Sequence, residues 1–275
     1  MRIDASLFKA AGDVQTNLTL LTEVQQYMDV VEYLRDSLDA DRPWYRGVSH
    51  ASYALVPRVY RDRLWEVHED FEWWLSVDFE NRARPFIPNH QTYSTWDWYF
   101  TMQHYGLPTR LLDWTEGSLI GLYFAVRAPQ ETHIPSVYFL DPYWFDEVVY
   151  QKEPGEGVAY NTDTKAISDE LETRLGSYLS SRNEAPPFPV CLQPPVIDAR
   201  IQAQKSVFTI HGKLIDPFRI VARDNVRARL VKIRLSTSSA CHLKDQLHGM
   251  GITEGTLFPG LRGLVEDLKW ERGVD

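Results

Sequence analysis

Cysteine is scarce in this chain, and long apolar runs are missing. Its 275 residues include two cysteines, Cys191 and Cys241, far apart and with no CxxC pair. This argues against a disulfide framework and a zinc site, and it favours a reducing compartment. No apolar run approaches the roughly 20 residues that a membrane-spanning helix needs, and the first residues lack the pattern of a secretory signal. We therefore expect a cytoplasmic protein with no membrane partner.

Familiar catalytic signatures are also absent. The chain contains no GxGxxG, no Walker loop, and no HExxH, GxSxG or kinase motif. Acidic residues outnumber basic ones, 38 to 29, giving a formal net charge of −9. This excess argues against a broad phosphate-binding surface but is compatible with a local basic cleft. The paired carboxylates fall on predicted solvated helix faces, so no metal site is predicted.

Apolar spacing predicts the elements of the fold. It indicates helices over 22–39, with Thr22 as the N-cap, and over 62–84, 93–105, 117–128, 240–250 and the C-terminal stretch. Alternation indicates strands over 44–48, 136–140, 200–210 and 227–235, while 109–115 is predicted to be a short connector. Helices are concentrated early and strands late. We therefore predict a single α+β domain with a mostly antiparallel sheet.

Two segments combine residues that could carry chemistry. In Trp44-Tyr45-Arg46-Gly47, an arginine between aromatics and a glycine can present its guanidinium where a phosphate approaches closely. A structural alternative is an ion pair of Arg46 at the edge of the core. Residues 103–115 place His104, Arg110 and Asp113 within ten residues. Arg110 and Asp113 are expected to form a semi-buried ion pair, or a catalytic pair if a cleft reaches them.

A third segment, 200–210, places Gln202 and Gln204 on one face of the predicted strand. These amides would line a polar cleft or belong to a solvated sheet face. His104 is interpreted either as a hydrogen-bonded structural histidine or as a base.

These segments resemble blocks of the FRG domain family, named for a Phe/Tyr-Arg-Gly motif. The resemblance rests on 45–47, 53–61, 103–115, 121–126, 200–212 and 251–264. It implies an FRG domain over 40–265, preceded by a helical lead-in over 1–39 and followed by a tail over 266–275. Lys205 departs from the pattern, in which a glycine is expected. Membership implies a bacterial or phage-related protein with a role in toxicity or defence.

The order of these motifs also resembles the ADP-ribosyltransferase superfamily, which implies a related fold and NAD as co-substrate. By this resemblance Arg46, beside Gly47, would hold the NAD ribose or phosphate, and Tyr45 or Tyr105 would stack on the ligand. Thr115 would support the pocket, and Gln204 would take the place of the catalytic glutamate. Because a glutamine carries no negative charge, Asp113 is the candidate carboxylate. The acceptor would be a protein, a nucleic acid or water.

Two alternatives stay open. One is a nuclease or other hydrolase that uses His104, Arg110 and Asp113. The other is a module without turnover whose Arg46 and Arg110 bind an anionic ligand or a partner chain. In every interpretation, we expect Arg46, Arg110 and Asp113 to flank one cleft.

Overall fold

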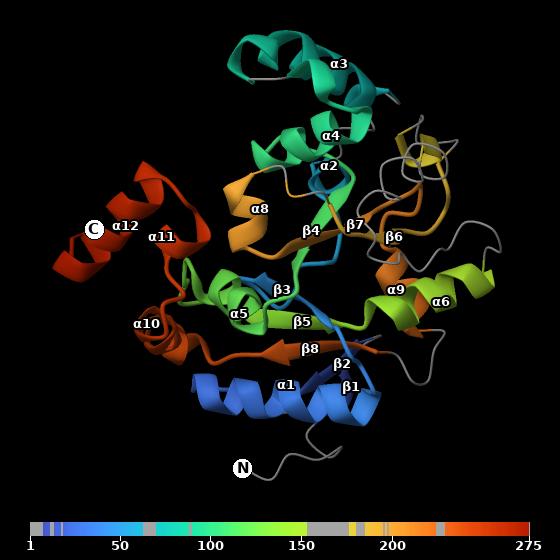
Figure 1. Ribbon diagram of the computed structural model, residues 1–275. Coiled ribbons are helices and arrows are strands. Elements are labelled where there is room, and N and C mark those ends of the chain that lie inside the picture. The colour runs from blue at the N-terminus through green and yellow to red at the C-terminus, as the bar shows by residue number, and fades with distance from the viewer. Residues whose placement is uncertain are drawn as a thin grey trace.

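The computed structural model describes residues 8–11, 14–17, 19–62, 70–87, 90–152, 176–179, 185–194, 196, 198–223 and 229–274. Within these ranges, eight strands form one sheet in the order β1-β2-β8-β5-β3-β4-β7-β6 (Figure 1). The strands are β1 (Phe8–Ala11), β2 (Val14–Asn17), β3 (Trp44–Val48), β4 (Leu111–Thr115), β5 (Ser136–Leu140), β6 (Val190–Leu192), β7 (Ser206–Ile210) and β8 (Leu230–Arg234). Neighbouring strands are antiparallel except for β2 and β8, which are parallel.

Helices surround the sheet. They are α1 (Val24–Leu38), α2 (Arg58–Arg61), α3 (Phe71–Ala83), α4 (Thr95–His104), α5 (Ser118–Val126), α6 (Pro142–Lys152), α8 (Ala199–Ala203), α9 (Pro217–Arg223), α10 (Ala240–Gly249), α11 (Glu254–Leu257) and α12 (Leu261–Arg272). Short 3₁₀ turns occur at Arg84–Phe86, His90–Thr92, Gly176–Leu179 and Thr237–Ser239. The single α+β domain and the mostly antiparallel sheet agree with the prediction. Strands are nevertheless spread along the whole chain and do not occur only late. The early strands β1 and β2 were not predicted because they are too short for alternation to be recognised.

The strand β3 contributes side chains to cores on both faces of the sheet. In β3, Tyr45 contributes to the core that α1, α5 and α10 cover, whereas Trp44 and Val48 contribute to the core under α6 and α9 (Figure 1). This follows from the strand period of two, which sends successive side chains to opposite faces. A third cluster packs α4 against β4, β6 and β7 and includes Trp96 and Phe208. A capping box at Ser94 begins α4.

The sheet divides at the seam between β3 and β4. Those strands share one residue pair, Tyr45 with Thr115, whereas β3 forms five pairs with β5 and β4 forms five with β7. Beyond that pair the two strands diverge. The seam therefore separates the sheet into a part that ends at β3 and a part that begins at β4.

Three local predictions are corrected by the structure. The segment predicted as a connector, 109–115, contains β4, which is buried in the middle of the sheet. The predicted strand over 200–210 begins only at Ser206, since 199–203 is the helix α8. Glu23, and not Thr22, is the N-cap of α1, although the Thr22 hydroxyl donates to Gln26.

Three predicted boundaries can also be compared with the structure. Of the helix predicted over 62–84, residues 63–69 lie outside the described part of the chain, and α3 occupies 71–83. The lead-in over 1–39 contains β1 and β2 in addition to α1. The helix α12 continues through the predicted domain end at 265 into the predicted tail.

Candidate functional site

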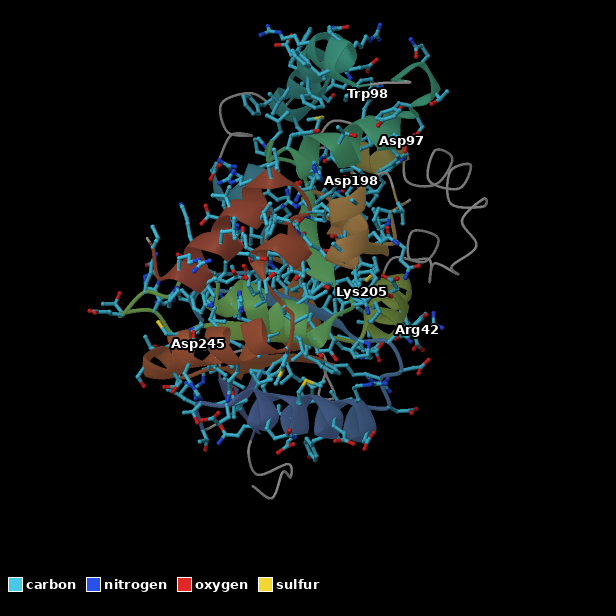
Figure 2. The ribbon with its side chains drawn as sticks, turned by 60° about the vertical axis from the view of Figure 1, so that its left-hand side comes forward. Arg42, Asp97, Trp98, Asp198, Lys205 and Asp245 are labelled. Carbon is cyan, nitrogen blue, oxygen red and sulfur yellow. The ribbon has the colours of Figure 1, made fainter. Side chains whose placement is uncertain are left out.

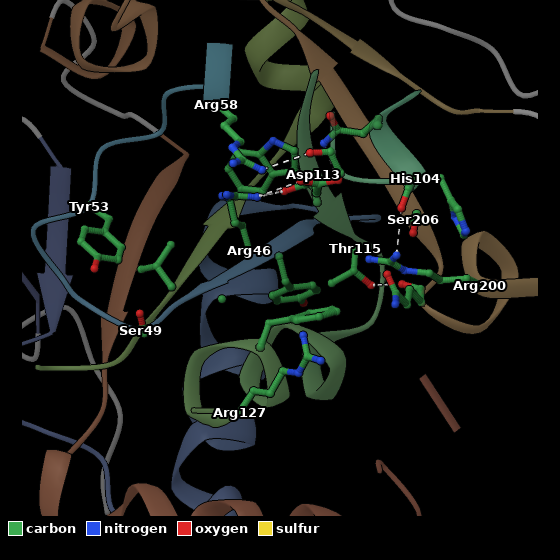
Figure 3. A pocket seen from close by; sticks show the side chains of 18 of the residues that line it. Arg46, Ser49, Tyr53, Arg58, His104, Asp113, Thr115, Arg127, Arg200 and Ser206 are labelled. Carbon is green, nitrogen blue, oxygen red and sulfur yellow. Dashed lines mark hydrogen bonds and ion pairs between the residues drawn. The ribbon is translucent and has the colours of Figure 1, made fainter. Parts of the chain in front are cut away.

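A pocket of about 640 Å³ lies at the seam between β3 and β4. Five of the residues that line it are arginines: Arg46 in β3, Arg58 and Arg61 in α2, Arg127 directly after α5, and Arg200 in α8 (Figure 3). Among the described lining residues, Asp113 is the one carboxylate. The pocket is therefore basic in a chain whose formal net charge is −9.

Arg46 spans the gap between the two strands. Its Nη1 donates to the backbone oxygen of Asp113 at 2.5 Å and lies 3.8 Å from the Asp113 carboxylate. The Arg46 Nε is buried and has no hydrogen-bond partner within the described part of the chain. Burial lowers the pKa of this guanidinium, and Asp113 opposes that effect. The closeness of Arg46 and Asp113 agrees with the expected cleft.

The Asp113 carboxylate is held from its other side. Gln103 Nε2 donates to Asp113 Oδ1 at 2.9 Å, and the Thr109 hydroxyl donates to Gln103 Oε1 at 2.6 Å. The Asp113 side chain is still 58% exposed. It is thus an oriented carboxylate that a ligand in the pocket can reach.

Thr115 and Gln204 form the floor of the pocket near the single β3–β4 pair. The Thr115 hydroxyl donates to the backbone oxygen of Gln204 at 2.6 Å and accepts from the Gly117 N–H at 3.0 Å. The side-chain amide of Gln204 donates to the Leu257 carbonyl at 2.9 Å, and the residue is buried. Both predicted residues therefore line the pocket.

Gln204 does not lie on a strand, and the predicted Gln-x-Gln strand is wrong. Asp198 caps α8 by accepting from the backbone N–H groups of Arg200 and Ile201, and Gln204 is the C-cap. The next residue, Lys205, has a φ of 45° (labelled in Figure 2). A glycine is favoured in this left-handed region, so the glycine expected from the resemblance corresponds to a helix end.

Arg110 lies elsewhere, and its predicted ion pair with Asp113 does not form. Its side chain is buried against Glu72 of α3, and its backbone N–H donates to Glu72 at 2.8 Å and to the Tyr99 hydroxyl at 2.9 Å. Arg110 and Asp113 are three residues apart beside and within β4, so their side chains leave opposite faces. Arg110 is not among the residues that line the arginine pocket.

The remaining motif residues divide between packing and ligand access. The ring of Tyr45 packs edge-on against Phe139 with centroids 5.8 Å apart, and burial raises its pKa to about 12. Gly47 has no room for a side chain, because a Cβ there would lie 2.1 Å from the Gly121 carbonyl oxygen in α5. Tyr105 is 70% exposed at the pocket rim, so of the two tyrosines it is the one free to stack on a ligand.

His104 lines the pocket on the side of α8 (Figure 3). Its Nδ1 lies 2.9 Å from Asp198 Oδ2, and burial lowers its pKa while Asp198 opposes the shift. The three residues of the hydrolase alternative are not assembled, since Arg110 is absent from the lining. Within the described ranges, no cluster of three histidines, cysteines or carboxylates is arranged to hold a metal ion.

Four of the five arginines were not predicted as site residues. Arg58 and Arg61 stand within block 53–61, Arg127 directly follows block 121–126, and Arg200 begins block 200–212. The signal was therefore present as arginines in or beside the matched blocks. Sequence could not show that these blocks meet at one pocket.

A protein-family model describes part of this chain. The model of the FRG domain matches residues 41–133. The chain contains an FRG domain. The matched segment carries four of the five pocket arginines, and the arginine of the motif for which the FRG domain is named lies in the seam. Neither the curated proteins nor the solved structures contain a match to the chain.

Among the helices in the described part of the chain, none combines the length and the apolar character that crossing a bilayer requires.

Proposed function

We propose that the FRG-domain protein binds NAD in the arginine pocket and cleaves it as an ADP-ribosyltransferase. The observation that carries this proposal is the convergence of five arginines around a single lining carboxylate. Neither Arg61 nor Arg200 forms an ion pair with a carboxylate in the described structure. Guanidinium groups suit phosphate because their planar forks donate in pairs. The volume lies within the roughly 300–1,000 Å³ of small-molecule sites.

The arrangement supports distinct roles for the lining residues. Arg46, Arg58 and Arg61 would hold the pyrophosphate, and Tyr105 would stack on one of the bases. Asp113 is the one negative charge within the lining, and Gln103 fixes its orientation. This carboxylate would face the ribose carbon that becomes positive during the reaction.

The proposed reaction breaks the bond between ribose C1′ and the nicotinamide nitrogen. The bonding electrons leave with nicotinamide, and the ribose becomes cation-like. An acceptor oxygen then bonds to C1′ and releases its proton, giving ADP-ribose with water or an ADP-ribosylated product with a macromolecule. The Asp113 carboxylate supplies electrostatic stabilisation, whereas the neutral Gln204 amide cannot. Such an activity would suit the toxin or defence role that the family resemblance implies.

A second candidate is a nucleotide-binding module without turnover. It is favoured by the position of Arg46 beside the only lining carboxylate in the described pocket, since that cation offsets the charge that the reaction would need. In this case NAD or a related nucleotide would bind and remain intact.

Nicotinamide release tests the proposal and separates the two candidates. NAD is incubated with the wild type and with Asp113→Asn, and nicotinamide is measured by chromatography. We expect release by the wild type and its loss in Asp113→Asn. Asp29→Asn, which makes the same charge change on α1, should behave as the wild type. Binding without release supports the module, and the absence of both contradicts the proposal.

A further inference from the structure

Two of the pocket arginines contact the same aromatic ring. The guanidinium carbon of Arg127 lies 4.3 Å from the ring centroid of Phe258, and that of Arg200 lies 4.9 Å from it. The two cations are close enough to influence each other. Burial lowers the pKa of Arg200, the carboxylates Asp113 and Asp198 oppose that shift, and the positive charge of Arg127 lowers the pKa further. An aromatic face attracts a guanidinium through its quadrupole, so Phe258 can hold both cations near one another.

Each arginine has one further contact that fixes it. Arg127 forms a bidentate ion pair with Glu254. Its Nη2 contacts one carboxylate oxygen of Glu254, and its Nε donates to the other oxygen at 2.9 Å. The Tyr123 hydroxyl also donates to Glu254. Arg200 Nη1 donates to the backbone oxygen of His104 at 3.1 Å, and no carboxylate pairs with it in the described structure. Its other donors therefore remain for a ligand.

The supporting residues come from the turn formed by α11 and the start of α12. Asp267 accepts from the Thr253 hydroxyl at 2.8 Å and from the Gly255 N–H at 3.0 Å, which fixes the first turn of α11. A Cβ at Gly255 would meet Asp267 at 2.2 Å, and one at Gly263 would meet the Phe258 carbonyl at 2.2 Å. Both glycines therefore permit α12 to lie directly on α11. Figure 1 shows this pair beside α5 and α8.

We propose that Arg127 and Arg200 form a phosphoryl-binding subsite, with Glu254 and Phe258 as its positioning residues. The subsite lies across the pocket from Arg46 and Arg58 (Figure 3). Two guanidinium groups held together against their repulsion suit a ligand group with two negative charges. The subsite depends on the proposed function in one respect, namely that the ligand is a nucleotide. It also gives a role to residues 251–264, which lie outside the family match over 41–133.

Arginine labelling tests the subsite without requiring catalysis. The folded protein is treated with p-hydroxyphenylglyoxal, with and without inorganic pyrophosphate, and the modified peptides are quantified by mass spectrometry. In the wild type, pyrophosphate is expected to slow labelling of Arg127 and Arg200. In Phe258→Leu both arginines should react faster, and pyrophosphate should no longer protect them. Phe258→Tyr, which keeps the aromatic face, should behave as the wild type.

Glu254→Gln provides a second and more local variant. It should raise the labelling of Arg127 more than that of Arg200, which forms no hydrogen bond with Glu254 in the described structure and feels only its charge. If Phe258→Leu does not fold, the comparison of Glu254→Gln with Phe258→Tyr still decides the question. Unchanged labelling of Arg127 and Arg200 across the variants, or no protection of either by pyrophosphate in the wild type, overturns the subsite. Protection by pyrophosphate but not by NAD leaves the subsite standing and removes NAD as its ligand, whereas the proposed function is tested separately by nicotinamide release.

Discussion

The arginines of this chain divide into those that line the pocket and those that pack elsewhere in the fold. Arg46 leaves β3 at the seam and lines the pocket, so the residue that the motif indicated as a candidate lies where a ligand could reach it. Arg110 leaves the opposite face of β4 from Asp113 and pairs with Glu72, 38 residues earlier. A partner so far away in the chain cannot be recognised from local spacing, which is why the predicted pair with Asp113 was wrong.

The buried Arg110–Glu72 pair gives a prediction about stability. Glu72→Gln removes the carboxylate that the buried guanidinium contacts, and we expect a loss of about 3–5 kcal/mol in the free energy of unfolding. Glu80→Gln removes one partner of the exposed Arg84–Glu80 pair and should cost at most about 1 kcal/mol. Urea denaturation monitored by tryptophan fluorescence measures both. Equal losses in the two variants would contradict the assigned difference in burial.

A buried carboxyl outside the pocket predicts a pH dependence. Burial raises the pKa of Asp146 to about 8 from its ordinary 3.8, although Asp146 accepts from the Cys191 N–H at 3.1 Å. The folded state therefore retains a proton that the unfolded chain loses near pH 4. This contribution to stability is complete below pH 4 and declines as the pH rises towards 8, by up to about 1.4 kcal/mol per pH unit.

Asp146→Asn should remove that slope because its amide oxygen can still accept from Cys191. Compared with the wild type, the variant should gain stability between pH 5 and 8 and keep a constant advantage above pH 8. Thermal unfolding across this range measures the difference. A wild type and variant with parallel pH profiles would show that Asp146 does not hold its proton.

At the level of elements, helices with clear apolar spacing and the strands β3, β5 and β8 were predictable, whereas β4 was not. The apolar spacing over 22–39 identified α1, which buries Val24, Tyr27, Val30, Val31 and Leu34. The helices predicted over 93–105 and 117–128 correspond to α4 and α5, which are buried on most sides. The sequence of β4 does not alternate, since Leu111 and Leu112 are adjacent, and the prediction of a connector there is wrong. The alternation over 200–204 was misleading, because the Asp198 cap begins a helix there.

The approach of α5 to β3 predicts a strict requirement for glycine at one position. Gly47→Ala would place a methyl group 2.1 Å from the Gly121 carbonyl oxygen, so α5 must move. We expect destabilisation of at least about 1–3 kcal/mol, the range for overpacked sites. Gly249→Ala at the end of α10 meets nothing within 4 Å and should be neutral or slightly stabilising. Melting temperatures compare the two, and equal tolerance of alanine would contradict the close packing.

At the scale of the whole molecule, the site joins segments that lie far apart in the chain, from Tyr45 to Ser206. The sequence indicated the Tyr-Arg-Gly segment, residues 103–115 and Gln204, and the structure brings most of these to one seam. Their assembly into a pocket with five arginines could not be predicted, because it depends on the divergence of β3 and β4 and on the placement of α8 and α11. No local pattern encodes that divergence.

The measurement that tests the central claim most directly is the thermal stabilisation of the protein by NAD. A ligand at 100 times its dissociation constant stabilises the state that it binds by about 2.7 kcal/mol. We predict an upward shift in the wild type and in Arg42→Ala, which removes an exposed arginine outside the pocket (Figure 2). The shift should shrink in Arg61→Ala, which removes an exposed pocket arginine, and vanish in Arg46→Ala. No shift in the wild type, or equal shifts in Arg42→Ala and Arg61→Ala, would contradict the account.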